Sequence, residues 1–346
     1  MRALQLPGWK QAPVLVEVPD PDPGPGQVVV RIAGAGACHS DLHMMQDFEE
    51  GTTGFSPPFT LGHENAGWVH ALGAGVDRLE VDQPVAVYGA WGCGQCYRCR
   101  QGMENYCELQ PGANILSGGL GVDGGMAPYM LVPSARFLVP LGDLDPVNAA
   151  PLTDAGLTPY HAIKPSLHRL VPGSSAVAIG VGGLGHLGVQ ILRALSPTRI
   201  IAVDTRDEAL ALAKQAGADV VVKAGETAVA EIREATKGKR ADLVLDFVGV
   251  DASMAMAARV ARPLGDVVIV GIGGGAFRLS FFSSNYEVSY RTTYWGTVPE
   301  LHEVLALAES GRLRPHVERF SLDDGPEVYE RLAAGLVRGR AVVTPG

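Results

Sequence analysis

Four of the five cysteines crowd into one short segment, and their spacing is the clearest chemical signal in the sequence. They form the pattern Cys-x2-Cys-x2-Cys-x7-Cys with Cys93, Cys96, Cys99 and Cys107. Four thiolates close the tetrahedral shell of a zinc ion and leave no position for water. Because disulfides are rare in cytosolic proteins, a redox or disulfide cluster is the weaker alternative. We therefore predict a structural zinc site in a lobe of about residues 91–108.

A second set of possible metal ligands is spread along the chain. It consists of Cys38 in GACHSDLH, His63 in LGHE and Asp154 in PLTDAGLT. Taken singly, a buried Cys is usually a packing residue, and a lone His is more often a core residue than a ligand. Three protein ligands with one open position instead make a catalytic zinc site, which can polarise an alcohol oxygen. Glu64 is either a reserve ligand or a partner of the ligands, or it makes an ordinary salt bridge.

A glycine-rich motif, GVGGLG, follows a strand pattern and precedes a helical pattern. Its glycines let the backbone approach a pyrophosphate at the helix N-terminus. Asp204 ends the next strand, where an acid bonds the ribose hydroxyls of NAD and repels the 2'-phosphate of NADP, while Arg206 leaves NADP as an alternative. A turn that only packs helix on sheet, or an FAD fold, would also fit the motif, but we predict NAD. The motif residues taken as cofactor-binding are Gly180, Gly182, Gly183, Leu184 and Gly185.

The elements that must position these residues change in character along the chain. Residues 1–153 are predicted to be β-rich, because apolar and polar residues alternate there between Pro and Gly. From about residue 174, buried strand patterns alternate with amphipathic helical ones, which predicts an α/β fold with a doubly wound parallel sheet. A helix is expected over Pro299–Ser310. The last segments, GRLRPHVERF and GRAVVTP, resemble the β-rich region, so we expect the chain to return to it.

Composition narrows the class of protein. A chain of 346 residues suits two domains, and its net charge of -9 argues against a nucleic-acid partner. No run of residues is apolar enough for a membrane span, and the N-terminus lacks a signal pattern. We expect a cytoplasmic protein with neither a membrane nor a nucleic-acid partner.

On these motifs the chain resembles the zinc-containing branch of the medium-chain dehydrogenase/reductase family, in particular bacterial secondary-alcohol dehydrogenases. The resemblance is nearly full length. It implies a GroES-like catalytic domain of residues 1–153 and 290–346, a Rossmann NAD-binding domain of residues 154–289, and an active site in the cleft. It also implies that Cys38, His63 and Asp154 hold the catalytic zinc, with Asp154 at a position where many relatives carry Cys.

The resemblance also assigns roles to single residues. Ser40 matches the hydroxyl that relays the alcohol proton, and His43 matches the histidine that carries it to solvent, with a partly exposed helix histidine as the alternative. Arg340 matches a residue near the pyrophosphate, although a solvent-facing charge beside Arg338 is the other interpretation. The remaining residues expected near the cofactor are His39, Thr158, Phe247, Val248, Val270 and Ile272.

These observations predict a zinc-dependent alcohol dehydrogenase that reversibly moves a hydride between a small alcohol and NAD. The pocket side chains we expect are apolar, which favours uncharged secondary alcohols: Phe55, Trp91, Leu120, Tyr294 and Trp295. The alternatives are a zinc-dependent polyol dehydrogenase and a non-catalytic NAD-binding sensor or structural protein; a zinc-free quinone reductase would lack both ligand sets. We expect a homodimer or homotetramer, with VVIVGIGGG as either a pairing edge or an internal strand.

Overall fold

The computed structural model describes residues 1–110 and 116–346, and these form two compact units. The first unit comprises Met1–Leu157, Trp295–Glu309 and Pro315–Gly346, and the second comprises Thr158–Tyr294 and Ser310–Arg314. Among the helices of the described residues, none has the length and apolar character that crossing a bilayer requires. The combination of a β-rich unit with a parallel-sheet unit confirms the predicted fold class.

The first unit is built around a seven-stranded sheet with the order β10-β6-β5-β3-β18-β17 and with β9 also paired to β3. Its long central strand β3 (Val28–Ala37) is almost wholly buried and pairs antiparallel with β5 (Glu64–Leu72) and β18 (Arg340–Thr344). The C-terminal strand β18 therefore pairs with the N-terminal part of this sheet. The other strands of this sheet are β6 (Pro84–Val87), β9 (Tyr129–Val132), β10 (Leu138–Pro140) and β17 (Val317–Ser321).

The antiparallel pairing of these three strands gathers chemically important residues at one end of the sheet. Cys38 follows the last residue of β3, Glu64 is the first residue of β5, and Arg340 is the first residue of β18. In the strand register Gly36 lies opposite Glu64, and Ala37 lies opposite Ala341. Because neighbouring antiparallel strands run in opposite directions, the end of β3 meets the beginnings of β5 and β18.

Smaller elements complete the first unit. Helix α1 (His39–Gln46) begins directly after Cys38, and α9 (Gly325–Ala333) precedes β18. A three-stranded sheet has the order β2-β1-β4, and β7 pairs with β8. The strands of these two small sheets are β1 (Arg2–Leu6), β2 (Val14–Glu17), β4 (Phe59–Thr60), β7 (Ser117–Gly118) and β8 (Gly121–Val122). The other α-helices of this unit are α2 (Pro146–Ala149) and α8 (Val298–Glu309), and α8 lies close to the predicted helix Pro299–Ser310.

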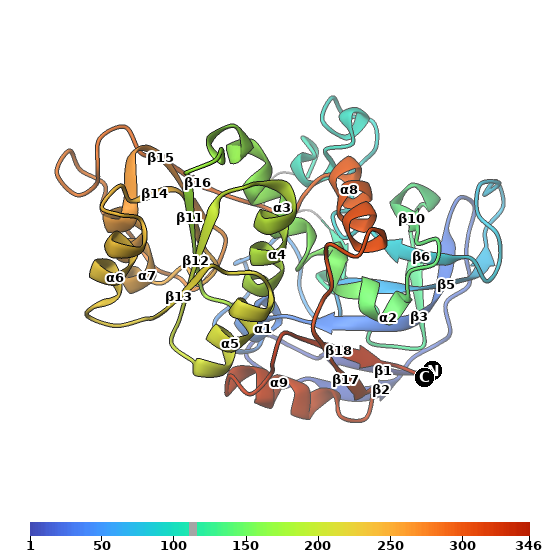
Figure 1. The fold of residues 1–346 in the computed structure, drawn as a ribbon. Helices are drawn as coiled ribbons and strands as arrows, with labels where there is room; N and C mark the ends of the chain where they lie inside the picture. Colours follow the sequence, from blue (N-terminus) through green and yellow to red (C-terminus); the bar gives the residue numbers. More distant parts are fainter. Residues whose placement is uncertain (111–115) are drawn as a thin grey trace. The chain divides into compact units, whose positions relative to one another are not determined.

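The second unit contains a six-stranded parallel sheet with the order β13-β12-β11-β14-β15-β16. Figure 1 shows helices α4 and α5 on one side of this sheet and α6 and α7 on the other. The strands are β11 (Ser175–Ile179), β12 (Arg199–Asp204), β13 (Val220–Lys223), β14 (Ala241–Asp246), β15 (Ala261–Ile269) and β16 (Ser289–Thr292). The helices are α3 (Leu157–Ile163, its first residue in the other unit), α4 (Gly185–Leu195), α5 (Asp207–Gln215), α6 (Ala228–Ala235) and α7 (Asp251–Val260).

Fully buried Val and Ile side chains from these strands form the core of the second unit, among them Val177, Ile201, Val203 and Val267. Strands buried on both faces need such continuous apolar runs, which explains the run in the sequence VVIVGIGGG. The first three residues of this run, Val267–Ile269, belong to β15, which lies between β14 and β16, and the remaining residues follow the end of the strand. The start of the run is therefore in an internal strand, and β16 is the edge strand at that end.

Candidate functional site

Cys38, His63 and Asp154 come together in the first unit, with one ligand atom from each lying within 4.8 Å of the others. His63 Nε2 is 3.7 Å from the Asp154 carboxylate, whose side chain is 16% exposed while His63 is buried. A thiolate, an imidazole and a carboxylate are donors that zinc accepts, and three of them leave a fourth position open. The residues present therefore fit a catalytic zinc ion.

Asp41 orients the imidazole of His63. Its carboxylate is fully buried, with Oδ1 3.2 Å from His63 Nδ1 and Oδ2 accepting a 3.0 Å hydrogen bond from the Cys38 backbone N–H. With Nδ1 turned toward this carboxylate, Nε2 faces the other two ligands. Sequence reasoning quoted Asp41 within the GACHSDLH segment but gave it no role. Its position three residues after Cys38, where an acid can cap the start of α1, is the signal that could have found it.

Glu64 is held in a buried ion pair. Arg340 Nε donates to Glu64 Oε2 at 2.7 Å and Arg340 Nη2 donates to Oε1 at 2.6 Å, between strands β5 and β18. Glu64 Oε1 also accepts the backbone N–H of Ala155 at 2.9 Å, so this side chain ties down the loop that carries Asp154. The interpretation of Arg340 as a solvent-facing charge is wrong, because the residue is 2% exposed. Its contact with a pyrophosphate stays a prediction, as does zinc ligation by Glu64.

The charges around Cys38 favour its thiolate. Burial by itself raises the pKa of the thiol, but the positive charge of Arg340 and a hydrogen bond with His63 lower it to about 7. Burial has the opposite effect on a cation and by itself lowers the pKa of Arg340. The negative charges of Cys38 and Glu64 outweigh this effect and raise the pKa above its usual range. A thiolate is the form of cysteine that binds metal, so this environment prepares Cys38 to act as a ligand.

The two predicted relay residues differ in how closely they approach the cluster. Ser40 Oγ lies 3.3 Å from His63 Nε2. His43, one helical turn further along α1, pairs through Nδ1 with Asp47 at 2.6 Å, and its side chain is 23% exposed. Ser40 is thus in reach of a group bound beside His63, and His43 is in reach of solvent.

Among the predicted pocket residues, Trp295 contacts a member of the ligand cluster. Its ring meets His63 edge-on with 6.1 Å between centroids, and its Nε1 donates to the carbonyl of Thr153, the residue before Asp154. A side chain at Gly89 would collide with the indole, since an added Cβ would lie 1.9 Å from Cζ2. The close approach of Trp295 therefore requires glycine at position 89.

The other predicted pocket residues make contacts of their own. Trp91 is buried, donates to the carbonyl of Tyr88 at 2.8 Å and stacks on Phe137, so packing explains much of its environment. Phe55 is half-buried between the rings of Trp9 and Phe59. Leu120 is half-buried between β7 and β8, while Tyr294 belongs to the second unit.

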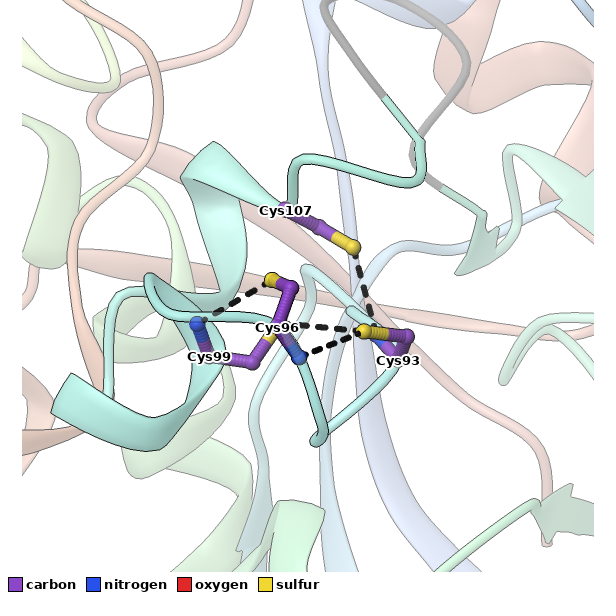
Figure 2. Close-up of side chains that lie close together, drawn as sticks. All are labelled: Cys93, Cys96, Cys99 and Cys107. Carbon is purple, nitrogen blue, oxygen red and sulfur yellow. Dashed lines mark hydrogen bonds between the residues drawn. The ribbon is translucent and has the colours of Figure 1, made fainter.

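The four clustered cysteines also converge, with their sulfur atoms within 4.8 Å of one another (Figure 2). Backbone N–H groups point at the sulfurs: Cys96 N donates to Cys93 Sγ and Cys93 N donates to Cys107 Sγ, both at 3.3 Å. Hydrogen bonds from the N–H groups of Gln95 and Cys96 lower the pKa of Cys93 to about 6. All five cysteines of the chain are free thiols. Four convergent sulfurs match a closed, structural zinc site.

The glycine motif forms a tight turn at the start of α4. Gly180 has a φ of +85°, and a Cβ on Gly185 would lie 1.9 Å from the Gly180 carbonyl oxygen, so both positions require glycine. A Cβ on Gly182 would meet no atom within 4 Å, which leaves open space at the helix N-terminus. Asp204 accepts the N–H of Val181 at 2.7 Å, and so the predicted ribose acid also braces this turn.

The remaining predicted cofactor residues occupy varied environments. Arg206 donates its N–H to Asp204 at 2.9 Å, and its side-chain Nε is 3.8 Å from the same carboxylate. The ring of Phe247 packs against Gly188 of α4, where an added Cβ would lie 2.6 Å from Cζ of the ring. Among the others, Val270 and Thr158 are buried, Val248 is 37% and Ile272 55% exposed, and His39 is exposed at the start of α1 in the first unit.

Comparisons with known proteins agree with this arrangement. Residues 24–143 match the alcohol dehydrogenase GroES-like domain, and residues 183–310 match the zinc-binding dehydrogenase domain. An NAD-dependent alcohol dehydrogenase of Sulfurisphaera tokodaii is 36% identical, with each chain covered completely. A D-arabinose 1-dehydrogenase (NADP(+)) of Saccharolobus solfataricus is 34% identical over 92% of this chain and 90% of its own.

A solved structure extends the similarity to the fold. The crystal structure of the alcohol dehydrogenase from Aeropyrum pernix superimposes with a TM-score of 0.92 at 38% identity and covers 100% of both chains. Sequence identity at this level over the full length indicates common descent, and the zinc-ligand clusters and glycine turn are present in this chain. The chain therefore belongs to the zinc-containing alcohol dehydrogenases of the medium-chain dehydrogenase/reductase family.

Proposed function

We propose that this chain catalyses the reversible transfer of a hydride between an alcohol and NAD, giving an aldehyde or a ketone, with two zinc ions per chain. The observation that carries the proposal is the convergence of Cys38, His63 and Asp154 into a three-ligand cluster, with the hydroxyl of Ser40 beside it. The similarity to an NAD-dependent alcohol dehydrogenase supports the choice of reaction and cofactor.

The side chains of the site have separate tasks in this reaction. A zinc ion held by Cys38, His63 and Asp154 would act as a Lewis acid toward the alcohol oxygen. Ser40 accepts the hydroxyl proton, and His43 passes it to solvent. Bound NAD would supply the acceptor for the carbinol hydride.

The cofactor is held mainly by backbone. The N–H groups at the start of α4, exposed by the turn from Gly180 to Gly185, bind the pyrophosphate. Asp204 takes the ribose hydroxyls with the lone pairs that Val181 and Arg206 leave free. A carboxylate at this position disfavours the extra phosphate of NADP.

The preferred substrates are proposed to be uncharged secondary alcohols. Trp295 places a buried indole against His63, and this apolar wall suits an alkyl or aryl substituent better than a polyol. The second candidate is a zinc-dependent sugar or polyol dehydrogenase, which is favoured by the similarity to a D-arabinose 1-dehydrogenase.

Metal analysis combined with initial rates tests both candidates. Two zinc ions per chain and faster NAD reduction with 2-propanol and 1-phenylethanol than with ethanol are the expected results. Faster turnover of D-arabinose or sorbitol than of any simple alcohol would replace the first candidate with the second. One zinc ion per chain and no turnover would mean that the four-cysteine lobe binds zinc and the second cluster does not. That result would favour a non-catalytic NAD-binding protein.

We also propose a homodimer or homotetramer that acts in the cytoplasm. Within the described residues β16 pairs on one side only, and the segment before it exposes large apolar side chains: Leu279, Phe281, Phe282 and Tyr286. A second copy would cover them. Light scattering should give an oligomer for the wild type and a smaller species for Phe282→Asp.

A further inference from the structure

Tyr329 is a buried side chain of α9 that points into the network behind the candidate catalytic zinc. It is 3% exposed, and its hydroxyl lies 2.9 Å from Asp41 Oδ2 and 3.4 Å from the sulfur of Met126. The tyrosine and the aspartate are 288 residues apart in sequence. The Tyr329 hydroxyl thus connects α9 to Asp41, the carboxylate that lies beside His63.

The Asp41 carboxylate needs this hydroxyl because nothing of it is exposed to water. Its Oδ2 receives two donors, the Cys38 backbone N–H at 3.0 Å and the Tyr329 hydroxyl. Its Oδ1 is left for His63, whose Nδ1 lies 3.2 Å away. The two hydrogen bonds to Oδ2 fix the orientation of this buried carboxylate and therefore the direction in which Oδ1 points.

The hydroxyl acts as a donor in this contact. Burial raises the pKa of Tyr329 well above its usual range, and the negative charge of Asp41 raises it further, so the phenol keeps its proton. A carboxylate fixed in this way can hold the Nδ1–H tautomer of His63 and leave Nε2 free for metal.

We propose that Tyr329 is a positioning residue for the catalytic zinc: it orients Asp41, and Asp41 orients His63. The inference rests on the proposed zinc function of the cluster and adds a determinant of metal affinity contributed by the C-terminal helix. Removing a direct partner of a metal-bound histidine costs about 10- to 100-fold in metal affinity. Tyr329 acts one contact further out, so the expected loss is about three- to tenfold.

The test measures zinc affinity directly, with no dependence on turnover. The zinc-loaded wild type and Tyr329→Phe are titrated with a competing chromogenic chelator, and the zinc of the four-cysteine lobe serves as an internal reference. The matched control is Tyr88→Phe, which removes a similarly buried hydroxyl that donates to the Gly296 carbonyl at 2.6 Å. Weaker binding of the catalytic zinc in Tyr329→Phe alone is the expected result.

Two further variants make the test specific. In an Asp41→Asn background, Tyr329→Phe should no longer change zinc affinity, because the effect runs through the carboxylate. Replacing Tyr329 with p-aminophenylalanine, which keeps a donor at the ring, should restore the affinity and also serves if the Phe variant fails to fold. Equal zinc affinity in Tyr329→Phe and Tyr88→Phe overturns this inference alone. A wild type that binds only one zinc overturns the proposed function and this inference with it.

Discussion

The two candidate zinc sites lie in the same unit but are built in different ways. The four-cysteine lobe takes all its ligands from one short segment and surrounds its sulfurs with backbone N–H donors from the same segment. The catalytic cluster takes Cys38, His63 and Asp154 from three separate segments and orients them with buried side chains, chiefly Asp41 and Glu64.

This difference separates what each metal is expected to do. A local loop that has few apolar side chains to bury depends on its metal for its structure. A cluster at the end of a sheet is positioned by the hydrogen-bonded pairing of its strands, and three protein ligands would leave a fourth position open to substrate. Loss of metal should therefore cost stability at the first site and activity at the second.

Replacement of a catalytic ligand gives the largest expected effect. His63→Ala should leave one zinc per chain and lower kcat/KM on the order of 10³-fold or more, because the Lewis acid is lost. Metal analysis and initial rates would check this. The control is His70→Ala, which replaces an exposed histidine of β5, the strand that begins directly after His63, and which should keep two zincs and full activity. Full activity of His63→Ala would contradict the catalytic role assigned to the Cys38, His63 and Asp154 cluster.

Replacement of a lobe cysteine should instead act on stability. Cys96→Ser breaks the four-thiolate shell, and we expect it to lower Tm by roughly 10 °C, equivalent to about 4 kcal/mol. Thermal unfolding of Cys96→Ser beside His63→Ala is the measurement. A smaller fall in Cys96→Ser than in His63→Ala would reverse the roles assigned to the two sites.

The buried ion pair behind the catalytic cluster tests whether side chains, rather than metal, hold that site together. Arg340→Met leaves the buried Glu64 without its partner, which should cost about 3 kcal/mol of unfolding free energy. Denaturant unfolding would measure it. The control is Arg319→Met, whose partner Asp145 is 46% exposed, and the expected change there is below about 1 kcal/mol. Similar losses in both variants would argue against a supporting role for the Glu64 pair.

Metal removal by a chelator gives the smallest expected contrast. The catalytic site has an open position through which a chelator can attack, whereas the lobe site is closed. We expect catalytic zinc to leave about tenfold faster, with activity lost before the circular dichroism changes. Simultaneous loss of both zincs would mean that the sites are coupled.

The fold class, the family and the cofactor could be predicted from the sequence because their signals are local. The cysteine spacing, and the glycine turn with Asp204 after the next strand, each lie within one supersecondary unit, and the structure shows the expected strand–turn–helix context. The domain boundaries at 153 and 290 and the roles given to single site residues stay predictions.

Long-range partners could not be predicted in the same way. Arg340 was expected either near a pyrophosphate or in solvent, yet it pairs with Glu64 from 276 residues away. Tyr329 carried no motif, and Asp41 was noted only as part of a segment. A tyrosine in a helix has the same local pattern whether its hydroxyl meets water or a buried carboxylate.

Spacing and turn geometry are properties of neighbouring residues. Local patterns in the sequence are therefore enough to predict the zinc ligands and the cofactor that the glycine turn binds. The contacts between buried charged side chains around the catalytic cluster follow from the tertiary structure. The ends of β3, β5 and β18 meet through antiparallel pairing, and the packing of α9 brings Tyr329 to Asp41. Such contacts depend on strand order and helix packing, which no local pattern specifies.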